Sequence, residues 1–127
     1  MQAIETENDG KPYKTAHANN HPKDHITTMN TTIREENGVY VLYIEGRLDT
    51  SAALQMGPVV ESLEDCWGHD IVLDCSAMDY ISSSGLRVFL QILKSAKAKH
   101  SRITVRGLTP GVRQIFDSTG FTELFGL

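Results

Sequence analysis

The sequence predicts an α/β domain with a mixed sheet, because segments with strand and helix periodicity alternate along it. Residues 31–36 and 39–44 flank Asn37-Gly38, a strong two-residue hairpin signal, so the first two strands are expected to be antiparallel. Further strands are expected at 71–75 and 102–106, each reached through a helical segment. Crossovers through helices make these later strands parallel to their neighbours, and the sheet is therefore mixed.

Three segments have the apolar spacing of amphipathic helices. In the first, an apolar stripe from Met56 to Trp67 is interrupted by Gly57-Pro58, so we expect a kink or a late helix start there. The second runs from Leu86 to Ala96, with apolar residues at helical spacing. In the third, Thr109-Pro110 is typical of a capped helix start with proline in the first turn, and Gly120 ends the helix.

Composition limits the class of protein. The chain has 127 residues, of which 40% are apolar and 22% charged, as expected for one globular domain with a modest core. Its formal net charge of −4 argues against a nucleic-acid-binding protein, because such domains usually carry a basic surplus or a basic face. The basic residues between Lys94 and Arg106 are interpreted as a solvated helix face and a strand start.

The cysteines and the hydropathy pattern indicate the cell compartment. Cys66 and Cys75 lie in apolar or helical surroundings without Cys-x-x-Cys spacing, so we expect two buried free thiols rather than a metal site. We find neither an apolar run long enough to span a bilayer nor the apolar core of a signal peptide. The expected location is the cytoplasm.

Residues 1–28 differ in kind from the rest. They have almost no large apolar side chains, so we expect a disordered polar tail, a native extension or an expression remnant, ahead of a domain at 29–127. His17, His21 and His25 recur at every fourth position and would share a helix face. A proline between them opposes that helix, so no metal site is predicted.

Three serines and a glycine, Ser82 to Gly85, stand between the expected strand at 71–75 and the following helix. Serine is a preferred helix N-cap, because its hydroxyl accepts a bond from an unpaired amide of the first turn, and this explains one serine. Glycine at a helix start indicates an unusual backbone angle or a close approach by another molecule. Because a helix start also favours a phosphate, the run is either a cap alone or an exposed hydroxyl that carries a phosphate.

No catalytic constellation surrounds these serines. The sequence has no Gly-x-Ser-x-Gly elbow, no Ser-x-x-Lys pair and no Gly-x-x-x-x-Gly-Lys-Ser/Thr phosphate loop. His69 and His100 lie at element boundaries without an evident partner. We therefore predict no enzyme, with no catalytic residue, no metal and no cofactor. A small ligand such as a nucleotide at the strand ends is a further alternative, without a phosphate loop to support it.

Three blocks of the sequence resemble the STAS domain, the family of bacterial anti-sigma factor antagonists and their sulfate-transporter relatives. The blocks are Ile44-Glu45-Gly46-Arg47-Leu48-Asp49-Thr50, then Leu73–Ser76 continuing into Ile81–Leu86, and finally Val112–Phe116 with Thr119-Gly120-Phe121. They stand in the family's order and span most of the chain from Met29 onward. The resemblance implies a single STAS-like domain, with a mixed four- to five-stranded sheet packed with helices.

The resemblance also implies a function. Anti-sigma factor antagonists bind an anti-sigma factor that is also a serine kinase, and so free the sigma factor. The kinase phosphorylates a serine at the start of the central helix, and a metal-dependent phosphatase restores the active form. The family's usual pattern there is Asp-Ser-Ser-Gly-Leu, in which the serine beside glycine is modified. Matched by position, that serine is Ser84, with Ser83 as the second candidate, and Ser82 stands where the family usually has aspartate.

The residues implied in partner binding are Asp49, Ser82, Ser83, Ser84, Gly85 and Leu86. Asp49 matches the family's aspartate in the Gly-x-Leu-Asp block, and it is equally well placed to cap a helix. Because sites gather at the carboxyl ends of parallel strands, Asp49 and Asp74 are expected to share one edge of the molecule with the serines. Val88 and Ile92 share a side of the central helix. We expect them to pack against a neighbouring helix, and the alternative is that they add apolar contact with the partner.

A second function is compatible with the same sequence. A STAS adaptor subunit of a membrane-associated transport complex would use the same surface as a constitutive interface. Co-purification separates the two, since one protein brings down a kinase and a sigma factor and the other brings down transporter subunits. The main prediction is an anti-sigma factor antagonist that serine phosphorylation switches off.

Overall fold

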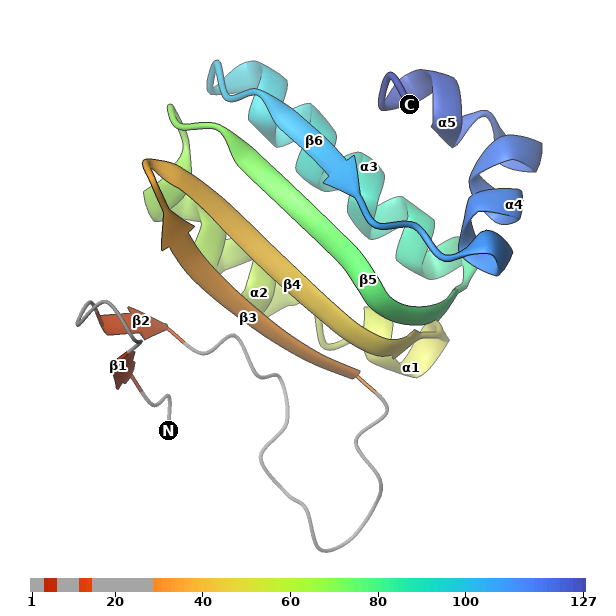
Figure 1. The fold of residues 1–127 in the computed structure, drawn as a ribbon, viewed down its shortest axis with the longest axis horizontal. Helices are drawn as coiled ribbons and strands as arrows, with labels where there is room; N and C mark the ends of the chain where they lie inside the picture. The colour runs from red at the N-terminus through yellow and green to blue at the C-terminus, as the bar shows by residue number, and fades with distance from the viewer. Residues whose placement is uncertain (1–3, 7–11, 15–28) are drawn as a thin grey trace, which may run out of the picture.

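The computed structural model describes residues 4–6, 12–14 and 29–127 (Figure 1). In the first two ranges, β1 (Ile4–Thr6) pairs antiparallel with β2 (Pro12–Lys14). The three N-terminal histidines lie outside the described residues, as does most of the expected disordered tail. Both expectations therefore stay predictions.

The main sheet is mixed, as the sequence predicts, and has four strands. In spatial order they are β3 (Met29–Glu36), β4 (Val39–Leu48), β5 (Ile71–Ile81) and β6 (Ile103–Arg106). β3 and β4 are antiparallel and joined by Asn37-Gly38, whose φ angles of 56° and 83° are both positive. β5 is parallel to both of its neighbours, since a helical crossover precedes it and another follows it.

Both central strands extend well past the apolar runs that predicted them. β4 and β5 remain paired as far as Leu48 and Ile81, across two register shifts. The expectation that Asp74 lies at a strand end beside the serines is wrong, because β5 continues from Asp74 to Ile81. The strand continues through exposed polar residues such as Ser76 and Asp79, which have no register partner in β4 and carry no strand signal of their own.

Helices cover one face of the sheet. The connection from β4 to β5 contains α1 (Thr50–Ala53), α2 (Gly57–Ser62) and a 3₁₀ turn, η1 (Leu63–Cys66). The connection from β5 to β6 is α3 (Ser83–Ala98). After β6 come α4 (Pro110–Thr119) and α5 (Phe121–Leu124). In Figure 1, α2 and α3 lie behind the sheet, and no helix of the described residues covers its near face. None of these helices is long and apolar enough to cross a membrane.

Two helix boundaries confirm the sequence predictions. A new helix, α2, starts at Gly57 with Pro58 in its first turn, four residues after α1 ends at Ala53. Gly120 ends α4 in the left-handed region, at φ 83°. Thr109 holds the N-cap position of α4, but its hydroxyl donates to the carbonyl of Met78 on β5 rather than capping the helix.

The core lies between the sheet and the helices. Phe89 of α3 and Phe116 of α4 are fully buried, and their rings meet edge to face with centroids 6.0 Å apart. Cys66 and Cys75 are buried free thiols, as predicted. Burial raises the pKa of the Cys75 thiol to about 12, so this thiol is protonated and unreactive at neutral pH.

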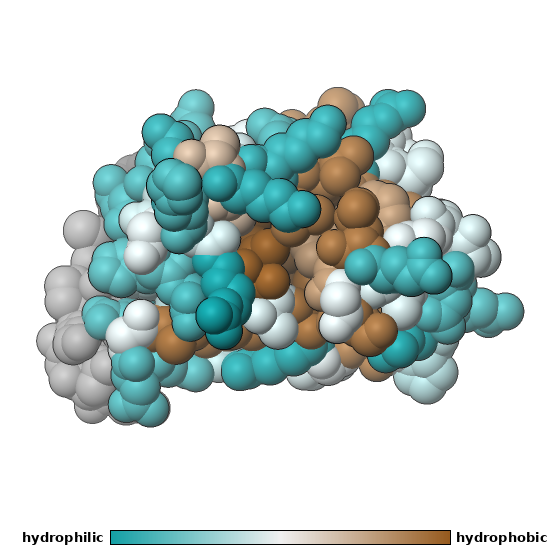
Figure 2. Space-filling model, turned by 90° about the horizontal axis from the view of Figure 1, so that it is seen from above, coloured by the Kyte–Doolittle hydropathy of each residue, from teal (hydrophilic) through white to brown (hydrophobic). Residues whose placement is uncertain are grey.

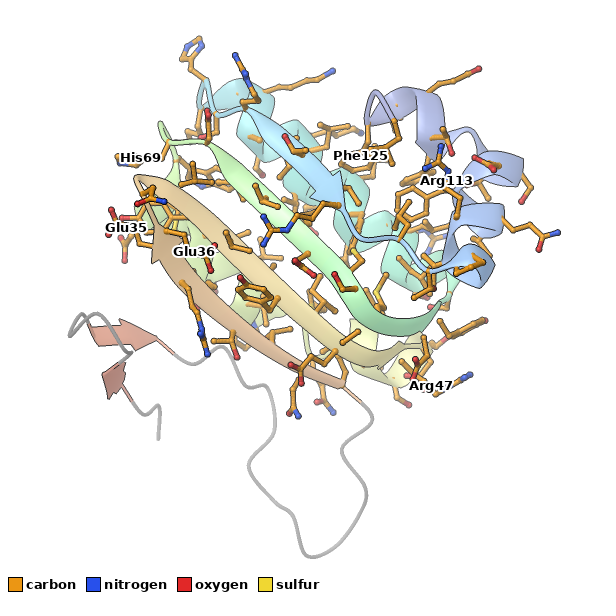
Figure 3. The ribbon with its side chains drawn as sticks, viewed as in Figure 1. Glu35, Glu36, Arg47, His69, Arg113 and Phe125 are labelled. Carbon is orange, nitrogen blue, oxygen red and sulfur yellow. The ribbon has the colours of Figure 1, made fainter. Side chains whose placement is uncertain are left out.

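The open face of the sheet carries a row of paired polar side chains, which includes Glu36 (Figure 3). Arg106 Nε donates to Asp74 Oδ2 over 2.7 Å, and the amide and hydroxyl of Ser76 donate to Asp74 Oδ1. Burial raises the pKa of Asp74, but these hydrogen bonds outweigh it and hold the pKa below its ordinary value. The Tyr43 hydroxyl donates to Glu36 over 2.5 Å and accepts from Arg106. Asp74 therefore links β5 to β6, and it does not lie at the end of β5 that precedes Ser82 to Ser84.

The side of the molecule formed by β6 and α5 is partly apolar. Figure 2 shows it from above, with hydrophobic atoms grouped around a hollow and hydrophilic side chains surrounding them. Leu124 and Leu127 are exposed at the C-terminal end, and Phe121 is half-buried. The Phe121 ring stacks on Phe125 with centroids 6.0 Å apart, which fastens α5 to the core.

The first turn of α3 lies directly against the end of β4. A Cβ atom at Gly85 would come within 2.8 Å of Ile81 Cγ1 and of Leu48 Cγ, and within 2.9 Å of the Leu48 carbonyl oxygen. Gly85 therefore permits a close approach of the chain to itself, a reason different from the two considered for it, an unusual backbone angle or a close approach by another molecule.

We expect Gly85→Ala to lower the free energy of unfolding by about 1–3 kcal/mol, because the added methyl group overpacks the contact with β4. Gly111→Ala is the matched control, since a Cβ atom at this helical glycine in α4 meets nothing within 4 Å. The control should be neutral or stabilising by up to about 1 kcal/mol. Urea unfolding of both variants measures the difference, and equal stabilities would contradict the packing argument.

Candidate functional site

Ser82 is the structural serine of the cluster. It is buried and holds the N-cap position of α3, where its hydroxyl accepts from the Gly85 amide over 3.1 Å. The same hydroxyl donates to the carbonyl of Leu48, and the Ser82 amide donates to that carbonyl over 2.9 Å. One side chain thus caps α3, as the cap interpretation predicted for a single serine, and it also holds the helix against β4.

Ser83 and Ser84 are the first two residues of α3, and neither side chain caps the helix or bonds to β4. Ser83 is exposed and Ser84 is half-buried. Within the described part of the chain, neither hydroxyl makes a hydrogen bond. Both can therefore react without breaking a contact of the fold. Gly85 and Leu86 are buried, so the accessible members of the predicted set are Asp49 and these two serines.

Asp49 lies at the same edge, where it caps α1. Its Oδ1 accepts from the Ala52 amide over 2.9 Å, and its side chain is half-buried. Because Ser82 is bonded to the carbonyl of Leu48, the residue before Asp49, the starts of α1 and α3 lie next to each other. The predicted neighbourhood of Asp49 and the serines is present, and Asp49 fills the cap role that the sequence left open.

Arg47 and Tyr80 flank this edge on the strand side, and the sequence analysis did not single them out. Arg47 lies at the end of β4 near α1 (Figure 3), and its guanidinium carbon is 4.5 Å from the centroid of the Tyr80 ring. Their pairing depends on a register shift between Gly46 and Arg47. No local pattern in the sequence reports such a shift.

Among the described residues, both histidines lie far from the serines of α3. His69 meets the Tyr40 ring edge to face at the far end of the sheet from Arg47 (Figure 3). His100 follows the C-terminal end of α3, roughly 24 Å along the helix from the serines at 1.5 Å per residue. Among the described residues, no group of three His, Cys, Asp or Glu side chains could hold a metal ion. What the arrangement does offer is two accessible serine hydroxyls in the first turn of a helix.

Comparison with known proteins gives the family. The family model described as the STAS domain matches residues 30–127. The chain belongs to the STAS domain family. Within it, BtrV of Bordetella bronchiseptica, a candidate anti-sigma factor antagonist, is 30% identical over 97 residues, which cover 76% of this chain and 84% of BtrV.

Solved STAS domains share the fold. An anti-sigma factor antagonist from Mycobacterium paratuberculosis superimposes with a TM-score of 0.65 at 21% identity, covering 76% of this chain and 82% of that one. The anti-sigma factor antagonist SpoIIAA, solved unphosphorylated, has a TM-score of 0.59 at 19% identity, covering 71% and 80%. Its phosphorylated form, from Bacillus, has a TM-score of 0.56 at 19% identity, covering 73% and 86%. At these identities the likeness establishes the fold of this STAS domain.

Alanine substitutions distinguish the structural serine from the other two. Ser82→Ala should lower the free energy of unfolding by about 0.5–2 kcal/mol, because it removes the cap of α3 and the bond to Leu48. Ser83→Ala and Ser84→Ala should each change it by less than about 0.5 kcal/mol. Thermal and urea unfolding measure the three variants side by side. A Ser84→Ala variant as unstable as Ser82→Ala would mean that Ser84 is also part of the fold.

Proposed function

We propose that this STAS domain is an anti-sigma factor antagonist that binds a kinase-type anti-sigma factor while Ser84 is unmodified. Phosphorylation of Ser84 by that kinase ends the binding, and a metal-dependent serine phosphatase restores it. The observation that carries the proposal is the free, accessible hydroxyl of Ser84 on a helix whose cap and packing depend on Ser82 and Gly85 instead. The anti-sigma factor antagonists among its relatives and structural neighbours support the same role.

The domain tolerates the modification because of where Ser84 lies. A phosphate adds a charge of roughly −1.5 to −2 at neutral pH. In the first turn of α3 this charge meets the positive end of the helix dipole, which stabilises an anion. Since the Ser84 hydroxyl makes no bond to the described residues, its loss costs the fold nothing. Phosphorylation therefore changes the surface and leaves the fold intact.

The same phosphate opposes binding to the kinase. During transfer, the serine hydroxyl faces the terminal phosphate of the bound nucleotide, and after transfer the new dianion faces the phosphates that remain. Like charges brought together at an interface cost several kcal/mol. A cost on the order of 3 kcal/mol lowers affinity more than a hundredfold, which is enough for a switch.

The neighbouring residues have supporting roles in this proposal. Ser83 and Asp49 lie at the same accessible edge and contact the partner, and Ser83 is the second candidate for modification. Ser82 replaces the family's usual aspartate, but as the buried N-cap residue it maintains the start of α3 that presents Ser84. A partner of this kind controls transcription, so the proposed function implies a cytoplasmic protein that binds no nucleic acid itself.

Replacing Ser84 with Asp should abolish binding to the purified anti-sigma factor and leave the melting temperature nearly unchanged, because the carboxylate adds negative charge at the interface. Ser84→Ala should bind like the wild type and resist inactivation by kinase and ATP. Ser118→Asp is the control, since it places the same charge on an exposed serine of α4. Isothermal titration calorimetry compares the variants, and normal binding by Ser84→Asp would refute the switch.

A further inference from the structure

A groove of about 310 Å³ lies between α3 and the segment that holds α1 and α2. Its apolar lining comes from Ala53, Met56, Val60 and Val88, and the carboxylates of Glu61 and Glu64 line it as well. This volume is at the lower end of the roughly 300–1,000 Å³ of small-molecule pockets. The groove is suited to one or two inserted side chains rather than to a cofactor.

The groove adjoins the proposed switch residue. Val88 stands four residues after Ser84 on α3, so both side chains lie on the same face of the helix, one turn apart. Ile92, one further turn along, is fully buried, whereas Val88 is only half-buried and reaches the groove. A partner that covers Ser84 therefore meets the groove next.

Leu54 extends the apolar surface at the rim. It directly follows Ala53, which lines the groove, and it is 83% exposed. A single exposed leucine is ordinary on a protein surface. Next in the chain to a residue that lines an apolar groove, it adds to the area that a partner can bury.

The charge of the groove selects the partner's chemistry. Glu61 and Glu64 are exposed, and among the described residues neither has an ion-pair partner. The described residues that line the groove include no lysine or arginine to balance them. A second copy of this chain, related by a two-fold axis through the groove, would bring the two pairs of carboxylates together and be repelled.

We infer that the groove receives a segment of the anti-sigma factor that inserts an apolar side chain and places a lysine or arginine against Glu61 and Glu64. This inference rests on the proposed function and adds how the partner is held. The apolar contact supplies affinity, and the ion pairs orient the segment and accelerate association. Ser84 remains the switch, because its phosphate acts on the nucleotide side of the partner.

The test measures binding of the purified anti-sigma factor by calorimetry at low and high salt. The double variant Glu61→Lys/Glu64→Lys should bind roughly tenfold or more weakly and lose most of the salt dependence. Leu54→Ser should also bind roughly tenfold more weakly, with unchanged stability. The control is Glu45→Lys/Glu123→Lys, which changes the net charge equally at two exposed glutamates outside the groove and should bind like the wild type.

Each other outcome overturns one part of the account. If both groove variants bind like the wild type while Ser84→Asp does not bind, the inference is wrong and the proposed function stands. If Ser84→Asp also binds normally, the proposed function is wrong. If the control double variant weakens binding as much as the groove variant does, the net charge of the protein determines the affinity and the groove does not. If sedimentation shows a wild-type dimer that Leu54→Ser dissociates, the groove holds a second copy instead.

Discussion

The carbonyl group of Leu48 is the contact on which the site depends. It accepts hydrogen bonds from both the amide and the hydroxyl of Ser82. Because Gly85 has no side chain, the first turn of α3 can also pack against Leu48. A single backbone oxygen at the end of β4 thus fixes where α3 begins. Because Asp49 follows Leu48 and caps α1, the same contact sets the starts of both helices side by side. The accessible edge of the molecule follows from this arrangement.

Adjacent serines in this cluster have different physical roles. Ser82 is buried and contributes two hydrogen bonds, so it belongs to the fold. Ser83 and Ser84, the next two residues, are accessible to solvent, and their hydroxyls make no hydrogen bond to the described residues. A chemical change at either of them alters charge and shape at the surface while the helix start stays fixed. This separation is what a phosphorylation switch requires, and a catalytic serine would need an activating base in addition.

The sequence predicted the parts of this structure that local chemistry determines. Asn37-Gly38 specified the hairpin because both turn residues need positive φ, and Gly57-Pro58 marked a helix start because proline fits the first turn. Contacts between distant residues were beyond such reasoning. Asp74 was misplaced because backbone pairing carries β5 on to Ile81 through polar residues, and Gly85 was misread because its neighbour is Leu48, far away in the sequence. The stacking of Arg47 on Tyr80 and the groove beside Val88 likewise depend on strand register and helix packing.

The most direct test of the central claim is an intact-mass spectrum with site mapping, on protein purified from its native host across growth and stress conditions. The account predicts a fraction of molecules that carry one phosphate, located on Ser84, with Ser82 never modified because its hydroxyl is buried and bonded. A serine cluster that stays unmodified under every condition would contradict the switch, and would favour a constitutive adaptor that uses the same edge of the fold.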